Sequence, residues 1–288
     1  MPAIRKVMRD ARTWGALLAL AMTAGVADMS ATRTAQGNQR NTTAPAADTT
    51  RTAEDNAKKL LKASSDYMAT QKAFSFDYDT YLEVVTEQKQ KLGLASSGTM
   101  TVNRPDKIRA TRHGGFADVE FMFDGNTMTM YGKNANAYAQ IAAPGTIDQL
   151  VDELRNKHGR PIPGADLLMS DVYSQLMPEV VDTKDLGSGV IGGVECDHLA
   201  FKTKEVDWEI WIAQGNRPYP CRYQITSTQV AGAPQYRIDV RSWNTGAVAS
   251  DRFTFKAPTN AKKLNPGELK DFDELPTIFK IKKAVGGR

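Results

Sequence analysis

The densest run of reactive side chains in the sequence is Glu195-Cys196-Asp197-His198. On a strand, Cys196 and His198 point to the same side, as a nucleophile and its general base would. Such pairs normally meet across a fold and not two residues apart along one strand. We therefore expect no catalytic cysteine here.

Cys196 and Cys221 are the chain's two cysteines. On neighbouring strands in an oxidising compartment they would form a disulfide, which is our prediction. The alternative is two buried free thiols. Two cysteines and three scattered histidines lack the ligand spacing of a zinc site, so we predict no metal.

The sequence holds no nucleophile elbow, phosphate loop, His-Glu-x-x-His helix or dinucleotide fingerprint. We therefore predict a protein that is not an enzyme and has no cofactor. Carboxylate pairs leave no regular trace in a sequence, so an unrecognised activity is the alternative.

The charge balance argues against nucleic acid as a partner. The net charge is +4, from 37 Lys and Arg against 33 Asp and Glu in 288 residues. Part of the excess lies in Arg5, Lys6, Arg9 and Arg12, so the remaining chain is close to neutral. Phosphate binding needs clustered cations, which the body of the chain lacks. Hydrophobic residues make up 41% of the chain, enough for a sizeable core.

This basic cluster begins a secretory signal. An apolar run follows at 14–26 and ends in small residues, which predicts a signal peptide over 1–27, cleaved after Ala27. The run is shorter than the roughly 20 residues of a spanning helix. An uncleaved anchor is the alternative, and either segment places the body outside the cytoplasm. We predict a periplasmic protein with no membrane span after cleavage.

The rest of the chain divides by composition. Residues 28–52 are rich in Thr, Ala, Asn and Gln and predict a disordered linker. Residues 53–265 predict one domain, and 266–288 a charged C-terminal tail. The domain opens with an amphipathic helix over 53–72, whose apolar stripe we expect to pack on a sheet and not on a membrane.

Alternation of apolar and polar residues then predicts an antiparallel meander of about eleven strands, a width at which the sheet must coil. Short connections favour antiparallel pairing over crossover helices. The predicted strands are 74–84, 96–103, 107–112, 119–123, 127–131, 137–141, 190–194, 196–202, 206–212, 221–228, 235–243 and 252–256.

Two helical stretches, 147–157 and 165–177, interrupt the meander and carry more apolar surface than one helix stripe needs. Ordinary core packing is one explanation. The other is that they roof a cavity with a soft, Met-bearing lining. The segment Gly159–Gly164 between them is a candidate hinge. Trp211 points away from Trp208 and Ile210, so either both sheet faces are covered there or Trp211 is an exposed contact.

Three stretches resemble a known family. They are 192–201, 206–212 and Pro218-Tyr219-Pro220, and they are similar to bacterial predicted periplasmic proteins of unknown function within the LolA and LppX-like lipoprotein-carrier superfamily. The resemblance runs over about 57–258 and includes 253–258, which resembles the superfamily's last core strand. It implies an α+β fold: a large curved antiparallel sheet, or half-open barrel, with helices on the concave side, where related carriers hold acyl chains.

The resemblance transfers no binding residue, and the chain lacks the lipobox cysteine of anchored members. We therefore expect a soluble periplasmic binding protein, possibly a carrier, with a lipid or acyl chain between the sheet and a helical lid. The alternative is an envelope sensor or assembly factor that binds another protein. The candidate cavity residues are Leu150, Leu154, Leu168, Met169, Tyr173, Leu176, Trp208 and Ile210.

Overall fold

The structure is a computed structural model that describes residues 46–115, 117–156, 163–266 and 268. The predicted signal peptide lies outside this part of the chain. So do most of the predicted linker and most of the predicted tail.

The described strands form one sheet of twelve, in the order β12-β6-β5-β4-β3-β2-β1-β11-β10-β9-β8-β7. All neighbours pair antiparallel except β12, which pairs parallel with β6. Two meanders, β1 to β6 and β7 to β11, are joined where β1 pairs with β11. The strands are β1 (Ala73–Val85), β2 (Lys91–Asn103), β3 (Lys107–Gly114), β4 (Asp118–Phe123), β5 (Thr127–Gly132), β6 (Ala137–Ala142), β7 (Asp182–Ile191), β8 (Val194–Lys202), β9 (Asp207–Ala213), β10 (Pro220–Thr226), β11 (Gln235–Thr245) and β12 (Lys262–Lys263).

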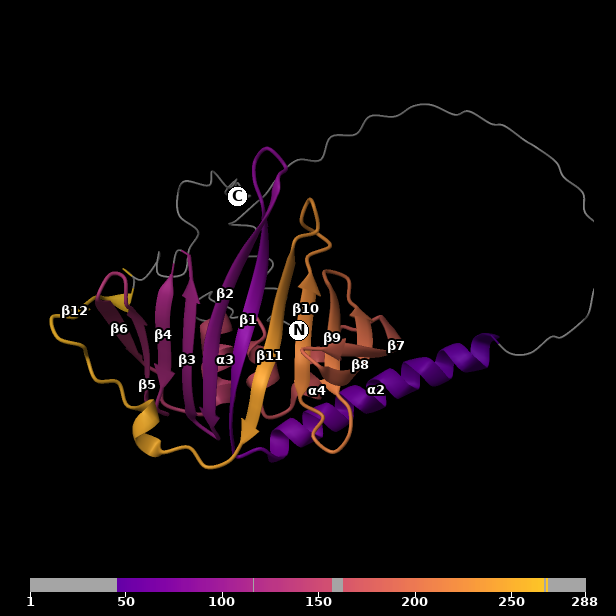
Figure 1. Ribbon diagram of the computed structural model, residues 1–288, viewed down its shortest axis with the longest axis horizontal. Coiled ribbons are helices and arrows are strands. Elements are labelled where there is room, and N and C mark those ends of the chain that lie inside the picture. The colour runs from indigo at the N-terminus through magenta and orange to yellow at the C-terminus, as the bar shows by residue number, and fades with distance from the viewer. Residues whose placement is uncertain (1–45, 116, 157–162, 267, 269–288) are drawn as a thin grey trace, which may run out of the picture.

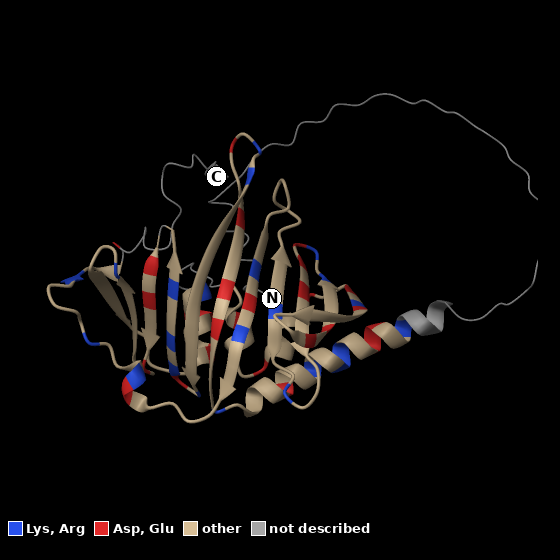
Figure 2. Ribbon diagram, in the orientation of Figure 1, with Lys and Arg blue, Asp and Glu red and all other residues tan. Residues whose placement is uncertain are grey.

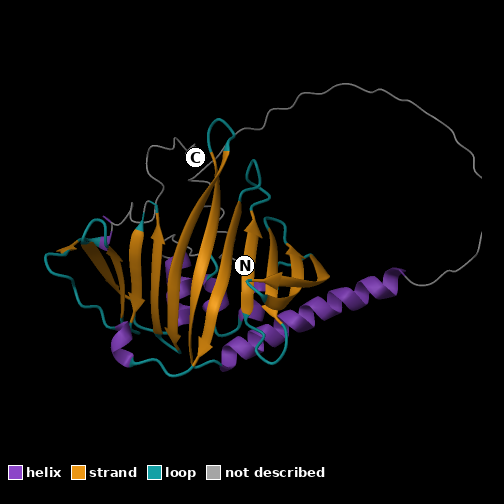
Figure 3. Cartoon of the chain, viewed as in Figure 1, coloured by secondary structure: helices purple, strands orange, loops and turns teal. Residues whose placement is uncertain are grey.

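The sheet is curved and remains open (Figure 1). Its two edges recede from the viewer, and α3 (Ile147–Asn156) and α4 (Val172–Leu176) lie behind it, on the concave side. Figure 3 shows the same separation of strands in front and short helices behind. The predicted fold class, a half-open antiparallel barrel with helices on its concave side, is confirmed.

Helix α2 (Ala46–Thr70) crosses the lower end of β7, β8 and β9. Ala57, Leu61 and Met68 form its buried stripe, so it packs on the sheet as expected. It begins within the stretch predicted as linker. Ala46 and Ala47 at its start are good helix formers.

Two strand predictions were wrong. The predicted strand 190–194 is interrupted: residues 190–191 end β7, residue 194 begins β8, and between them Gly192 and Gly193 form the hairpin turn with φ of 58° and 85°, a region that glycine reaches without strain. The predicted last strand, 252–256, is a 3₁₀ turn, η3 (Ser250–Phe253), followed by extended chain. This segment attaches to the outer face through side chains: Phe253 is 1% exposed, and Phe255 packs on the ring of Tyr138 at 4.9 Å.

The predicted helix over 165–177 is two pieces, η2 (Ala165–Leu168) and α4. Met169 is extended, and Asp171 caps α4 by accepting a hydrogen bond from the Ser174 N–H at 3.0 Å. We call α3, η2 and α4, with residues 169–171 that join η2 to α4, the lid. The predicted hinge lies largely outside the described residues, although its last residue, Gly164, has φ of 79°.

The core beneath the lid is divided into two apolar clusters. The α3 cluster packs α3 on β1 to β5, and the α4 cluster packs α4 and α2 on β8 to β10. The buried members of the α3 cluster are Met68, Phe74, Phe76, Tyr78, Val102, Ile108, Phe123, Met128, Ala143, Ile147, Leu150, Val151, Leu154, Ala165, Leu168, Met169 and Trp243. Those of the α4 cluster are Ala57, Leu61, Leu167, Val172, Leu176, Leu199, Phe201, Val206, Trp208, Ile210, Ile212, Tyr223 and Ile225.

Candidate functional site

The structure places all eight candidate cavity residues in the core between the lid and the sheet, but divides them between the two clusters. Leu150, Leu154, Leu168 and Met169 belong to the α3 cluster, and Leu176, Trp208 and Ile210 to the α4 cluster. These seven are between 1% and 8% exposed, so they form packed core in this conformation. Tyr173 is half-buried against the α4 cluster. That they line a ligand cavity stays a prediction.

The polar groups of the lid mostly bind one another. The Ser170 N–H donates to the Asp148 carboxylate at 2.9 Å, which fastens the loop before α4 to the start of α3. Arg155 of α3 donates to Asp166 of η2 at 2.5 Å, with both side chains buried. These bonds make the lid a cross-linked unit.

Hydrogen bonds fasten this unit to α2 and to the connection between β2 and β3. The Ile147 N–H donates to the Pro105 carbonyl at 2.8 Å, Arg104 donates to the Met169 carbonyl at 3.3 Å, and the Tyr173 N–H donates to the Ser65 hydroxyl at 3.0 Å. Apolar packing in the two clusters adds to these bonds.

The Arg155–Asp166 ion pair is a feature that sequence reasoning missed. Their side chains are 3% and 8% exposed. Burial raises the pKa of Asp166, and the Arg155 charge opposes this shift. A buried ion pair of this kind adds little net stability, but removal of one partner is costly. The sequence offered one indication of a buried aspartate, because Asp166 is flanked by the apolar residues Ala165 and Leu167.

Cys196 and Cys221 meet on the outer, convex face of the sheet, on either side of Ala213. Both thiols are buried and free, and the pair is 2.9 Å apart. The Cys221 S–H hydrogen bonds to the Cys196 sulfur, which lowers the pKa of Cys196 and raises that of Cys221. The predicted disulfide is therefore absent here, because the sulfur atoms are in contact but not bonded.

His198 does not serve Cys196 as a base. Its ring stacks on Trp211, with centroids 4.0 Å apart, and its Nε2 lies 2.7 Å from Glu209. The Arg222 guanidinium lies 5.4 Å from the Trp211 ring centroid. Trp211 is thus half-buried between these neighbours, which corrects the interpretation of it as an exposed contact.

The outer face carries charges of both signs along β1, β11 and β3 (Figure 2). Many of them are paired: Arg241 lies 2.8 Å from Asp79, and Arg222 binds Asp239. Such a compensated surface is typical of a solvated sheet face. In the part of the chain that the structure describes, no three His, Cys, Asp or Glu side chains gather as metal ligands do.

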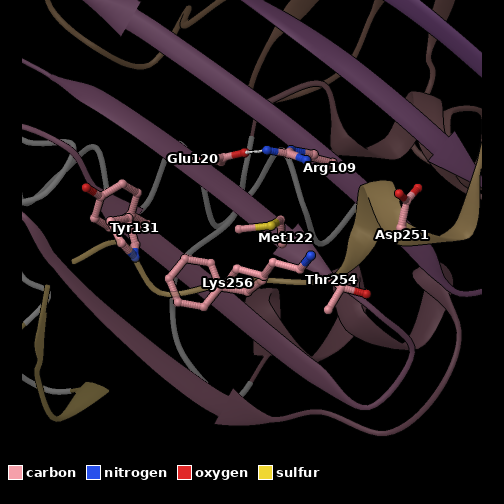
Figure 4. Close-up of a pocket in the computed structure, with 9 residues that line it drawn as sticks. Arg109, Glu120, Met122, Tyr131, Asp251, Thr254 and Lys256 are labelled. Carbon is pink, nitrogen blue, oxygen red and sulfur yellow. Dashed lines mark hydrogen bonds and ion pairs between the residues drawn. The ribbon is translucent and has the colours of Figure 1, made fainter.

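A recess of about 210 Å³ lies on this outer face, under the segment that follows η3 (Figure 4). The Arg109 Nε donates to Glu120 at 2.6 Å across its upper wall, and the Arg109 Nη1 donates to the Arg252 carbonyl at 3.0 Å. These bonds hold the C-terminal segment against β3 and β4. A second recess, of about 570 Å³, lies beside the α2–β1 connection. Neither is lined by a candidate cavity residue.

The fold defines the class of protein, a half-open antiparallel barrel with a lid on its concave face. Residues 57–265 match the family of predicted periplasmic proteins designated DUF2092, and the chain belongs to this family. The family resemblance stated from the sequence is thereby confirmed. Among the described residues, no helix has the length and hydropathy needed to cross a membrane.

No curated protein matches the chain. Among solved structures, it is similar to an uncharacterized conserved protein from Thermus thermophilus, with 10% identity, a TM-score of 0.44, and coverage of 73% of this chain and 99% of that one. It is similar to a chain of the MucA/MucB complex of Pseudomonas aeruginosa, with 15% identity, a TM-score of 0.41, and coverage of 70% of this chain and 62% of that one. It is also similar to the lipoprotein LppX of Mycobacterium tuberculosis, with 13% identity, a TM-score of 0.40, and coverage of 68% of this chain and 98% of that one. We draw no functional argument from likeness at this level.

Proposed function

We propose that this protein is a periplasmic binding protein that holds a lipid or acyl chain between the curved sheet and the lid. The observation that carries the proposal is the way the lid is attached. Its polar bonds are internal, whereas its contact with the sheet is largely apolar.

An interface of this kind can open without leaving many broken hydrogen bonds. Apolar attraction is non-directional, and each methylene transferred from water contributes about 0.8 kcal/mol. An acyl chain that enters beneath the lid would replace lid–sheet contacts with lid–ligand and sheet–ligand contacts of the same kind. The conformation described above is then the closed, empty state, and the ligand shifts the population toward an open one.

A pair of matched methionine variants tests the proposal. Met169 belongs to the lid and is 2% exposed, whereas Met122 lies on the outer face of β4 and is 3% exposed. Truncation of Met169 to Ala should loosen the lid and raise the rate of phospholipid uptake several-fold. Met122→Ala should lower stability by a similar amount, about 2–5 kcal/mol, and leave uptake unchanged.

Uptake is measured with vesicles of dioleoyl-phosphatidylglycerol and dioleoyl-phosphatidylethanolamine, by mass spectrometry of lipid extracted from the re-isolated protein. The proposal is wrong if the wild-type protein takes up no lipid. It is also wrong if the two variants change uptake equally, because the effect would then come from general destabilisation.

Export is part of the same proposal. The N-terminal basic and apolar segments support cleavage after Ala27. N-terminal sequencing of protein recovered from the periplasm should begin at Asp28. A mature protein that still begins at Met1 would favour the uncleaved anchor.

We also propose that Cys196 and Cys221 become a disulfide after export. Their contact across Ala213 supports this, as a periplasmic thiol–disulfide oxidant can accept the two electrons while both thiol protons are released. Protein purified from the periplasm and unfolded without reductant should show no free thiol by Ellman titration, and cytoplasmic protein should show two. Two thiols in the periplasmic sample would overturn the proposal.

Protein binding is the second candidate function, favoured by the edge strand β7. Leu186 and Val190 on this strand are 47% and 65% exposed, and Val181, which lies before the strand, is 61% exposed. An open edge with apolar side chains can accept a strand from a partner. Val190→Lys should then abolish crosslinking to the partner in the periplasm, whereas Val181→Lys, outside the strand, should preserve it. Equal crosslinking by both variants would remove β7 from consideration.

A further inference from the structure

A buried polar seam runs between the two apolar clusters under the lid. Arg155 of α3 and Asp166 of η2 form its ion pair. The neighbours of Asp166 mark its position: Ala165 and Leu168 pack in the α3 cluster, and Leu167 packs in the α4 cluster. The pair therefore lies at the junction of two regions that are otherwise apolar.

On the α4-cluster side of this pair, the sheet carries two buried donors. Tyr223 of β10 is 1% exposed, and its O–H has no hydrogen-bond partner among the described residues. Trp208 of β9 lies beside it, with ring centroids 5.9 Å apart. Trp208 is also 1% exposed, and its Nε1–H likewise lacks a partner within the described chain.

Tyr223 is fixed as a donor by its surroundings. Burial and the nearby Asp166 carboxylate raise the pKa of Tyr223 well above its ordinary value, so the hydroxyl keeps its proton. Asp166 is itself bound to Arg155. Buried polar groups are almost always hydrogen-bonded, so two buried donors on neighbouring strands that lack an acceptor in the described chain indicate that a ligand supplies one.

The residues around the seam restrict which chemical group can be that acceptor. Apolar clusters lie on both sides, so the ligand must be apolar on either side of its polar group. Arg155 pairs with both Asp166 and Asp152, so no net positive charge calls for a free carboxylate or phosphate, and the Arg155 Nε–H is a further buried donor without a partner in the described chain. A neutral carbonyl can accept from both an O–H and an N–H, since its oxygen has two lone pairs.

We propose that Tyr223 and Trp208 form a subsite for the ester or amide carbonyl of an acyl lipid, placed at the seam with hydrocarbon in the flanking clusters. This inference rests on the proposed function, because the lid must open to admit the chain. It adds that the ligand class is an acylated molecule and not a plain hydrocarbon.

The test compares two probes that differ in the acceptor. Methyl palmitate carries an ester carbonyl, and heptadecane is an alkane of similar length. Both are offered together from methyl-β-cyclodextrin, and the ratio of ester to alkane bound is measured by mass spectrometry after extraction. The variant is Tyr223→Phe, which removes only the hydroxyl.

We expect the wild-type protein to prefer the ester, and Tyr223→Phe to lower the bound ratio about fivefold, the usual worth of one hydrogen bond. Alkane uptake should stay the same. The melting temperature of the empty variant should not fall, because the hydroxyl makes no bond there. The control is Tyr131→Phe, since that hydroxyl donates to Asn136 at 3.0 Å, remote from the lid, and it should keep the wild-type ratio.

Three results would overturn the subsite. If Tyr223→Phe takes up alkane and keeps the wild-type ratio, the hydroxyl recognises no carbonyl, and the proposed function stands without it. A lowered melting temperature with an unchanged ratio would assign the hydroxyl to a buried water. If the wild-type protein takes up neither probe, the subsite and the proposed function both fail.

Discussion

Tyr78 lies on the concave face of β1, where burial raises the pKa of its hydroxyl from 10.0 to about 12, opposed by the charge of Arg112. The protonated hydroxyl donates to the Thr111 carbonyl at 2.7 Å. A raised pKa means that the unfolded chain loses this proton first. The stabilisation is therefore fully present below pH 10 and is lost as the pH rises through about 12.

Tyr78→Phe should remove this pH dependence. The free energy of unfolding of the wild-type protein should fall by about 2–3 kcal/mol relative to that of the variant between pH 10 and 12. Urea denaturation at a series of pH values measures both curves. The other tyrosines are present in both proteins, so the difference reports Tyr78 together with its effect on the pKa of Tyr236, which Tyr78 helps to raise. Parallel curves would show that the hydroxyl ionises as easily when folded as when unfolded.

At the scale of elements, the lid and α2 are attached in different ways. Helix α2 fixes its stripe to the sheet and adds polar contacts, such as the Asn56 amide to Asp185 at 2.5 Å. The lid relies on packing. We therefore expect α2 to behave as a permanent part of the barrel and the lid as the element that moves.

Leu61→Ala in α2 should lower the free energy of unfolding by about 2–5 kcal/mol, because Leu61 is 1% exposed and its truncation leaves a cavity against the α4 cluster. Lys59→Ala, on the exposed side of the same helix, should change it by less than about 0.5 kcal/mol. Chemical denaturation followed by circular dichroism gives both values. A small effect of Leu61→Ala would mean that α2 is only loosely docked.

At the scale of the whole molecule, the two halves of the sheet are covered differently. The outer face of β3 to β6 is covered by the C-terminal segment, through Phe253, Phe255 and the pairing of β12 with β6. The outer face of β1 and β8 to β11 carries paired charges instead (Figure 2). The C-terminal segment therefore completes one half of the barrel.

Phe253→Ala should release this segment. We expect a loss of about 3–5 kcal/mol in unfolding free energy, together with new proteolytic cleavage between residues 249 and 258. Thr254→Ala, at an exposed position next to it, is the matched control and should leave both measurements close to the wild-type values. If Phe253→Ala stays resistant to protease, the segment is held by β12 and not by the aromatic side chain.

Local sequence patterns were sufficient to predict most strands of the sheet. Alternation from Phe74 to Val84 predicted β1, and short polar turns predicted antiparallel order, because side chains on a strand alternate between its faces whatever the partner strand is. The sequence also showed that the helical stretches of the lid carry more apolar residues than one buried helix face needs. The family resemblance came from motifs on β8 and β9 and their turns.

Only the tertiary structure decided which of these residues meet. Arg155 and Asp166 form an ion pair because η2 folds back on α3, and Asp166 lies near enough to Tyr223 of β10 to help raise the pKa of that tyrosine. The division of the core into two clusters has the same origin. Periodicity reports which face a residue occupies within its own element, but contact between elements depends on how the whole sheet curves and where the lid rests, and no local pattern records that.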